Sequence, residues 1–512
     1  MDIDIDEISA LDIKFFSILK NISSSNRKER YEAVQSVRKI LSVENNPPID
    51  RVIEAGLVPI LHKYLVDETD FEIQYEASWA LTNVASGSSE HTNYIVENEI
   101  HKSIIDLLST SSNFELLEQN IWALGNIIGD SSQHRDSILN EGIVLHLVEI
   151  LKTQTKKSLV SNISWTISNL CRGTPRPAFR FIKPLLPSIK NLLVAWSKET
   201  DIISDTLWAL SFLTEATSEE NEIFSSVISI GLVEIIIHLI STSHINNWII
   251  PGFRTIGNML SGPDDVADHL LNCNVLKVFP KFLSSSKPSL VKEAFWCLSN
   301  ITSGPQNQIQ RVIDEGLMKR AIETGKRLST TPEILREVTW AIINAITGAS
   351  QSQLINLIKM DCLQCLKQNY STAQTQANLF HYYLDGVSNL LRSFITQVKS
   401  FQSLELFNTF IETEFFEQLI EDSADSESEF IGDYERLYAT YTELTCAVKE
   451  LRELKISNNE KIDEIYDPNN DCDFPNILKT SIEFDSDSEE DCEDPEDYEE
   501  DLPKINEMDL DE

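Results

Sequence analysis

Basic side chains are scarce in this sequence. Its 512 residues hold 42 Lys and Arg against 81 Asp and Glu, which gives a net charge of −39. A protein that binds nucleic acid or an anionic membrane surface neutralises phosphate groups with Lys and Arg. The charge balance therefore argues against nucleic acid and anionic lipid as partners and favours basic ones.

Long apolar runs and secretory signals are also missing. No stretch of 18 apolar residues is present, so we expect no transmembrane helix and no membrane insertion. The chain starts with the acidic, alternating sequence MDIDIDEISA, which differs from the basic start and apolar stretch of a secretory signal.

Cysteines are few and catalytic motifs are absent. Of eight cysteines only Cys362 and Cys365 form a CxxC pair, with no second pair at zinc spacing, so we expect no metal site. This usage fits a reducing cytosolic or nuclear compartment. The sequence contains no GxSxG, HExxH or Walker glycine loop, and its nine His residues are dispersed. We therefore expect neither an enzyme nor a cofactor.

A Trp followed four residues later by an Asn recurs along the chain. The copies lie roughly 43 residues apart, inside the ~40–47 residue period of helical repeats. A spacing of four places both side chains of a pair on one face of a helix. The pairs are Trp79–Asn83, Trp122–Asn126, Trp165–Asn169, Trp296–Asn300 and Trp340–Asn344, with weaker copies at Trp208–Phe212 and Arg254–Asn258.

A glycine recurs between two apolar helical patterns, at Gly56, Gly142, Gly231 and Gly316. Glycine suits the left-handed residue that ends a helix. Each repeat is therefore predicted to be a short helix, a glycine corner, a second helix, and a third helix with the Trp–Asn pair. The sequence predicts an all-α solenoid of about ten three-helix repeats over residues 27–455. A short acidic segment, 1–26, precedes it, and the acidic tail 456–512 is predicted to be disordered.

The aligned pairs predict a surface that holds an extended chain. Asn amides can bond both the donors and the acceptors of a peptide backbone, at about 0.5–1.5 kcal/mol per bond. Spaces between parallel indoles suit the long stems of Lys and Arg, and ring faces attract cations. Carboxylates nearby would select ammonium or guanidinium groups, and the candidates are Asp130, Asp201, Asp205 and Glu337. The predicted ligand is an extended Lys/Arg-rich peptide.

Several segments resemble the armadillo family and, within it, the importin-α branch. They are ASWALTNVASGSSEHT, EQNIWALGNIIGDSS, SWTISNLCRGTPRP, TLWALSFLTEAT, RTIGNMLSG, EAFWCLSNITSG and EVTWAIINAITGAS. The resemblance covers about residues 27 to 392. It implies a right-handed superhelical solenoid of about ten armadillo repeats that serves as a non-enzymatic adaptor in nuclear import. The partners it implies are proteins with basic nuclear localisation signals, and the adaptor would shuttle between cytoplasm and nucleus.

The resemblance also implies two cargo-binding sites. The major site comprises Trp79, Asn83, Gly87, Thr92, Gln119, Trp122, Asn126, Asp130, Trp165, Asn169 and Asp205. The minor site comprises Arg254, Asn258, Trp296, Asn300, Glu337, Trp340 and Asn344. Gly87, Thr92 and Asp130 match the family's lysine pocket. The sequence departs from the family at Phe212, where a Tyr is usual, and at Ala267, where the minor site has a Thr.

The start of the chain departs from the family as well. Importin-α proteins usually begin with a long basic arm that binds importin-β and, when free, folds back onto the cargo site. Residues 1–26 contain only Lys14 and Lys20 as basic residues. We therefore expect this arm to be missing or vestigial, the site not to be inhibited by it, and recruitment of importin-β through it to fail. The family also implies recycling by a nuclear exportin that binds the last repeats.

Other interpretations remain open. The chain could be an armadillo scaffold for adhesion or signalling, with a basic groove for acidic partners, although Trp and Asn on an acidic background favour the import adaptor. Tryptophans could serve as core residues, yet core positions would not need an Asn one turn later. Trp196 and Trp248 fall out of phase and are predicted to pack in the interior.

Overall fold

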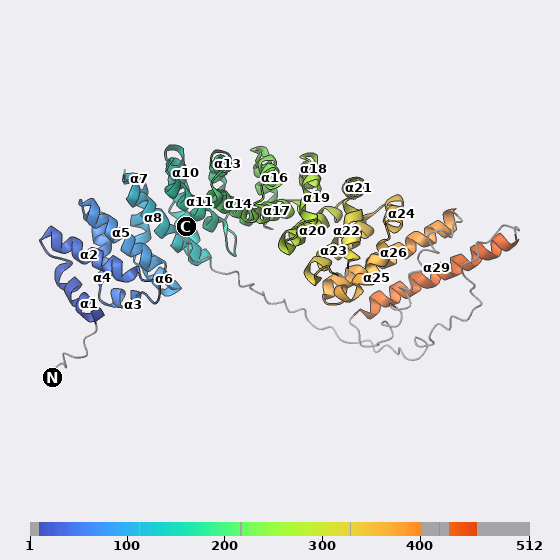
Figure 1. The fold of residues 1–512 in the computed structure, drawn as a ribbon, viewed down its shortest axis with the longest axis horizontal. Helices are drawn as coiled ribbons and strands as arrows, with labels where there is room; N and C mark the ends of the chain where they lie inside the picture. Colours follow the sequence, from blue (N-terminus) through green and yellow to red (C-terminus); the bar gives the residue numbers. More distant parts are fainter. Residues whose placement is uncertain are drawn as a thin grey trace, which may run out of the picture.

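The computed structural model describes residues 10–111, 113–215, 218–327, 329–401, 419 and 430–457. Every regular element within these ranges is an α-helix or a short 3-10 helix. The helices stand side by side in an arched row (Figure 1). The predicted all-α solenoid is confirmed.

Eight units of three helices repeat along the described part of the chain. They are α3 (Ile49–Glu54), α4 (Leu57–Asp67), α5 (Phe71–Ala85); α6 (Ser89–Glu97), α7 (Ile100–Thr110), α8 (Phe114–Asp130); α9 (Ser132–Asn140), α10 (Ile143–Thr153), α11 (Lys157–Cys171); α12 (Phe179–Ile182), which continues through η2 (Lys183–Leu185) into α13 (Leu186–Ala195), then α14 (Thr200–Thr214); α15 (Glu220–Ser229), α16 (Leu232–Thr242), α17 (Asn246–Leu260); α18 (Asp264–Asn272), η3 (Val275–Val278) with α19 (Phe279–Leu283), α20 (Pro288–Thr302); α21 (Gln306–Asp314), α22 (Leu317–Gly325), α23 (Pro332–Gly348); and α24 (Gln351–Lys359), α25 (Cys362–Ala373), α26 (Ala377–Phe401).

The third helix of each unit packs against the third helix of the next. These contacts run without a break from α5 through α8, α11, α14, α17, α20 and α23 to α26. Figure 1 shows α14, α17, α20 and α23 on the inner side of the arch and α10, α13 and α16 at its outer edge. A residue at the same position of each third helix therefore recurs along one inner face.

Further helices pack at both ends of the row. Helix α1 (Ala10–Asn21) precedes α2 (Arg27–Leu41), and its side chains Phe15 and Ile18 are buried in the core. The hydroxyl of Tyr64 in α4 donates to the carbonyl of Ile22, which fastens the end of α1 to the next unit. Packed helical structure therefore begins before residue 27. At the other end α29 (Ile431–Ser457) packs on α26, and the predicted tail lies outside the described residues from 458 onward.

The glycine corners are confirmed. Gly56, Gly142, Gly231 and Gly316 have φ values of 67°, 83°, 74° and 71° and each starts the second helix of its unit. Three other units make the same corner with Glu99, Asn274 and Asp361, at φ of 56°, 61° and 71°. A side chain in this left-handed conformation costs about 1–2 kcal/mol. These three corners carry no glycine, so a search for glycine alone does not detect them.

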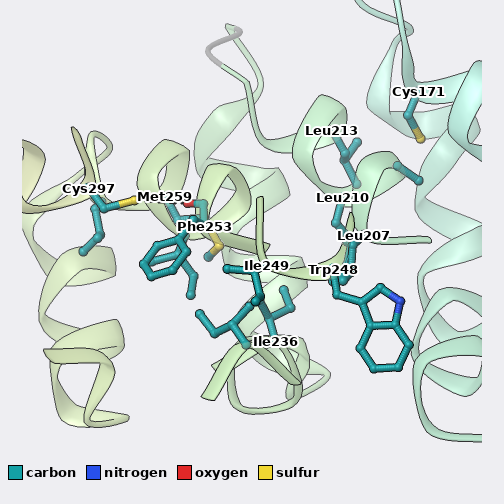
Figure 2. Packing of buried hydrophobic residues seen from close by; sticks show 14 of the residues in the cluster. Cys171, Leu207, Leu210, Leu213, Ile236, Trp248, Ile249, Phe253, Met259 and Cys297 are labelled. Carbon is teal, nitrogen blue, oxygen red and sulfur yellow. Dashed lines mark hydrogen bonds between the residues drawn. The ribbon is translucent and has the colours of Figure 1, made fainter. Parts of the chain in front are cut away.

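The core is one hydrophobic cluster that extends along the whole row. Figure 2 shows part of it, with Leu207, Leu210 and Leu213 of α14 beside Ile249, Phe253 and Met259 of α17 and Cys297 of α20. Trp248 is only 8% exposed, and its indole N–H donates to the carbonyl of Thr200 at 3.1 Å. Trp196 is partly buried against the same cluster. The predicted packing role of the two tryptophans that fall out of phase is confirmed.

No single helix of the described chain has both the length and the apolar composition of a membrane span. Helices α15 and α16 meet that test only when they are taken together, and they are bent by 74° relative to each other.

Candidate functional site

The tryptophans that recur in phase lie on the third helices, and none of them is buried. Trp122 is 39% exposed, and the other five, Trp79, Trp165, Trp208, Trp296 and Trp340, are partly exposed. We call these six residues, with Asn83, Asn126, Asn169, Asn258, Asn300 and Asn344, the Trp–Asn array. The contrast with the buried Trp248 shows that the tryptophans of the array lie at the surface of the third helices and not in the core.

Two indoles rest directly on glycines of the preceding third helix. A Cβ on Gly125 would come within 2.2 Å of Cζ3 of Trp165, and a Cβ on Gly257 within 2.1 Å of Cζ3 of Trp296. Each glycine stands immediately before an array asparagine, in WALGN and RTIGN. The sequence did not predict this role, although the small residue at that position is present in both motifs.

Most array asparagines fasten neighbouring third helices. The amide Nδ2 of Asn169 donates to the carbonyl of Gly125 at 3.1 Å, and that of Asn300 to Gly257 at 2.9 Å. An asparagine side chain has a second N–H and an acceptor oxygen. One donor of these amides is therefore used between repeats, and only the remaining groups can serve a ligand. The same bond is made by Asn344 to Ser299 at 3.1 Å and by Asn258 to Ser211 at 3.0 Å.

The two asparagines nearest the start of the array differ. Nδ2 of Asn83 donates to the hydroxyl of Ser42 at 2.9 Å. Nδ2 of Asn126 is buried and has no hydrogen-bond partner among the described residues. An unpaired buried donor costs about 1–3 kcal/mol. An acceptor brought to Asn126 would remove that cost.

Arg38 covers the first indole of the array. Its Cζ lies 4.4 Å from the ring centroid of Trp79, and its Nε lies 2.8 Å from Oε2 of Glu76. Glu76 is 5% exposed and also accepts from the side chain of Gln35 at 3.0 Å. This cluster was not predicted from the sequence, because Arg38 and Gln35 belong to α2, a helix without a Trp–Asn pair.

Arg254 covers a second indole, in the middle of the array. Its Cζ lies 5.8 Å from the ring of Trp208, and its Nε lies 3.4 Å from Oε1 of Glu293. Trp208 also stacks on Phe212, with ring centroids 5.6 Å apart. The predicted interruption of the array at Phe212 and Arg254 is thus a place where the protein supplies its own cation.

The other four indoles are not covered by a basic side chain of the described residues. They form two pairs, Trp122 with Trp165 and Trp296 with Trp340, on either side of Trp208. Tyr382 of α26 extends the second pair, since it is 48% exposed and its ring centroid lies 5.5 Å from that of Trp340. Tyr382 was not predicted from the sequence, because it does not belong to a Trp–Asn motif.

The structure brings Asp130 to the turn that contains Gly87. Ser89 donates to Oδ1 of Asp130 at 2.7 Å, and Nδ1 of His134 lies 2.9 Å from Oδ2. Thr92 is only 1% exposed, and its hydroxyl donates to the carbonyl of Ala85 at 3.4 Å. In the free protein the carboxylate already has two partners and the hydroxyl is covered.

Gln119 lies beneath the array. Its side chain is 5% exposed, and its Nε2 has no partner among the described residues. The backbone carbonyl of Gln119 accepts a hydrogen bond from the hydroxyl of Thr82 at 3.3 Å, which joins α8 to α5. In the free protein Gln119 therefore stabilises the packing of α8 on α5 and is not part of the exposed face.

Two carboxyl groups at the array are held toward their neutral form. Burial raises the pKa of Asp205 to about 7, the charge of Asp201 adds to the rise, and a hydrogen bond from Ser164 at 3.4 Å opposes it. Burial also raises the pKa of Glu337, which Arg336 opposes from 3.4 Å. A cation that reached either group would favour its charged form.

Comparisons with known proteins agree with this architecture. The model of the armadillo/beta-catenin-like repeat matches residues 45–86, 131–172 and 263–303. The chain is 36% identical over 307 residues to importin subunit alpha-1a of Oryza sativa subsp. japonica, which covers 59% of this chain and 56% of the relative. It is 35% identical over 354 residues to importin subunit alpha-5 of Arabidopsis thaliana, which covers 69% of this chain and 67% of the relative.

Two further comparisons set the extent of the likeness. Importin subunit alpha-3 of Arabidopsis thaliana is 34% identical over 281 residues, or 52% of its length, so the chain spans about half the length of several of these relatives. The crystal structure of an engineered protein superposes with a TM-score of 0.72 at 22% identity and covers 83% of this chain and 98% of its own. That likeness shows the fold.

Proposed function

The chain belongs to the importin-α family of armadillo-repeat proteins, and we propose that it is an adaptor for nuclear protein import. The Trp–Asn array binds the Lys/Arg-rich localisation signal of a cargo protein as an extended strand. The observation that carries this proposal is the spacing of the open indoles: two pairs, separated by Trp208, whose face Arg254 already covers.

The Trp122–Trp165 pair forms the major site. Stems of Lys or Arg lie between the indoles, and each cation gains about 0.5–2 kcal/mol from the ring faces. Asp130 and Asp205 supply negative charge, and Asp205 becomes charged as the cation arrives, because burial holds its pKa at about 7 in the free protein. The second N–H of Asn169 donates to the peptide backbone, and the unpaired but buried N–H of Asn126 does so once its side chain turns toward the peptide.

The Trp296–Trp340 pair forms the minor site. Its carboxylate is Glu337, which is 7% exposed and also has a raised pKa because it is buried. Ala267, where the family has a Thr, is 2% exposed in α18 and offers no hydroxyl. A signal with one basic cluster occupies one pair of indoles, and a signal with two clusters spans the covered Trp208.

The net charge of −39 adds a long-range attraction. A negative protein accelerates the approach of a basic segment, and the effect falls as salt screens it. Recycling by a nuclear exportin and movement between cytoplasm and nucleus stay predictions from the resemblance, and so does the expectation that importin-β is not recruited through a basic N-terminal arm.

A titration with three labelled peptides tests the proposal. The first is lysine-rich, the second has the same length with every Lys replaced by Gln, and the third is acidic; anisotropy is followed on the full chain. We expect the lysine-rich peptide to bind at least about tenfold more tightly than the glutamine peptide, a difference of about 1.4 kcal/mol, and to weaken with salt. Equal binding of the first two contradicts the proposal, and preference for the acidic peptide supports the adhesion or signalling scaffold instead.

A further inference from the structure

Three side chains of the types that bind metal ions in proteins lie close together at the outer side of the row. Glu234 lies in the first turn of α16, His269 in the last turn of α18, and Cys273 directly after α18. Sγ of Cys273 lies 3.7 Å from Nε2 of His269 and 3.8 Å from Oε1 of Glu234. Nε2 of His269 lies 3.9 Å from Oε1 of Glu234. Helices α16 and α18 both stand at the outer edge of the arch (Figure 1).

These three atoms surround a common point. They form a nearly equilateral triangle with sides of 3.7, 3.8 and 3.9 Å. Tetrahedral zinc with S, N and O ligands at about 2.0–2.3 Å separates its ligand atoms by roughly 3.3–3.8 Å, so small movements of the side chains toward one ion would complete the geometry. The imidazole and the carboxylate are too far apart for a hydrogen bond with each other. The thiol of Cys273 makes only long contacts to the other two side chains, which an ion bound between all three would replace with shorter bonds.

We propose that Glu234, His269 and Cys273 bind one Zn²⁺, with water as the fourth ligand. A thiolate, an imidazole and a carboxylate form a ligand set that suits zinc, whereas Mg²⁺ and Ca²⁺ take oxygen ligands. His269 and Cys273 are four residues apart, so one turn of chain presents both, and Glu234 comes from the preceding unit. The site was not expected from the sequence, because no CxxC or HExxH spacing marks it.

Binding at this site changes the protonation of the thiol. A free cysteine is a neutral thiol at neutral pH, whereas zinc binds the thiolate. Zinc replaces the thiol proton, which is released to solvent as the S–Zn bond forms. No electron is transferred, and the site needs no co-reactant.

The ion would join two adjacent units. Helix α16 belongs to the unit whose third helix carries Arg254, and α18 belongs to the unit whose third helix carries Trp296. The site therefore links the outer helices at the place where the array passes from its covered centre to the second pair of open indoles. All three ligands are at least partly exposed, so the ion can enter from solvent.

Cobalt serves as the spectroscopic probe. Full-length reduced protein is titrated with Co²⁺, and the thiolate-to-cobalt charge-transfer band is recorded, followed by displacement with Zn²⁺. We expect the band to saturate at one Co²⁺ per chain and to disappear on addition of one equivalent of Zn²⁺. Cys273→Ser should abolish the band, and Glu234→Gln and His269→Gln should each weaken metal binding at least about tenfold.

Cys446→Ser is the matched control, because Cys446 is an exposed free cysteine in α29. It should keep the band, and Zn²⁺ should raise the unfolding temperature of this control and of the wild type but not of Cys273→Ser. Absence of a band at stoichiometric Co²⁺, or a band that survives Cys273→Ser, overturns the proposal. Circular dichroism shows that each variant is folded, and the peptide titration described above is independent of this result.

Discussion

Trp165 lies on Gly125 of the preceding third helix so closely that only a hydrogen fits between them. A Cβ on Gly125 would stand 2.2 Å from Cζ3 and 2.8 Å from Cε3 of the indole. The carbonyl of the same glycine accepts from Asn169, the partner of Trp165, at 3.1 Å. One residue therefore sets the position of both members of a Trp–Asn pair in the next repeat.

Gly125→Ala should displace the indole of Trp165. Overpacking of this kind costs about 1–3 kcal/mol, so the urea midpoint should fall and affinity for a lysine-rich peptide should fall with it. Gly432→Ala in α29 is the matched control, because a Cβ there meets nothing within 4 Å. A Gly125→Ala variant as stable as the wild type would show that the indole is not held by this contact.

Substitutions of Asn126 and of Asn169 should differ in their effect on the stability of the fold, although both should weaken peptide binding. Asn169→Ala removes a bond between repeats and should cost about 0.5–1.5 kcal/mol of unfolding free energy as well as peptide affinity. Asn126→Ala removes a donor that has no partner among the described residues, so it should weaken peptide binding with little loss of stability. Denaturant unfolding and peptide titration of both variants measure the difference. Equal stability losses would contradict these assigned roles.

The ion pair of Arg38 and Glu76 should behave as a unit. Both side chains are largely buried, with 16% and 7% of their surfaces exposed. Arg38→Met leaves a buried carboxylate and should cost about 3–5 kcal/mol, whereas the double variant with Glu76→Met should recover much of that loss. Unfolding of the wild type, both single variants and the double variant gives the coupling energy. Additive losses would show that the pair is not coupled.

The position of Arg38 also predicts that the tryptophans of the array contribute unequally to peptide affinity. Because its guanidinium already covers Trp79, the change Trp79→Ala should weaken a lysine-rich peptide less than Trp122→Ala does. Anisotropy titrations of the two variants compare them directly. A larger loss at Trp79 would mean that the peptide displaces Arg38.

Peptide affinity should rise with pH because of Asp205. Burial raises the pKa of this carboxyl to about 7, so it is mostly protonated at about pH 6 and mostly ionised at about pH 8. A lysine favours the ionised form, hence tighter binding as pH rises through 7. Stability follows the opposite course, because the folded state holds the proton more strongly than the unfolded state. This contribution is fully present below about pH 4, where an unfolded Asp is also protonated, and is lost progressively as pH rises to the folded pKa of about 7.

Asp205→Asn removes this titrating group from the array. The variant should lose a substantial part of the pH dependence of affinity between about pH 6 and pH 8, measured at constant ionic strength. The same profile in the wild type and in Asp205→Asn would assign the pH dependence to another group.

Periodicity was sufficient to predict the repeats and the exposed face. The spacing of Trp79, Trp122 and Trp165 placed each on a third helix, and Trp248, out of phase, was correctly predicted to be buried. Contacts between repeats were harder to predict, because they join residues about forty positions apart. No local pattern marks Arg38 as the cation over Trp79 or Tyr382 as the neighbour of Trp340.

The sequence also assigned too simple a role to the asparagines. It predicted donors for a peptide, whereas Asn169, Asn300 and Asn344 use one donor to bond the preceding third helix. Only the angle between packed helices decides whether an amide reaches a neighbouring carbonyl, and a single sequence does not specify that angle. Which of the predicted site residues touch a cargo stays a prediction.

The most direct test changes both members of one pair, Trp122→Ala with Asn126→Ala, and measures binding of a lysine-rich peptide by anisotropy. Tyr438→Ala is the control, since Tyr438 has the same 39% exposure as Trp122 but lies in α29, away from the array. The account predicts that the double variant stays folded and loses at least about tenfold in affinity, while the control binds as the wild type does. Unchanged affinity in the double variant would contradict the central claim that the Trp–Asn array is the binding surface.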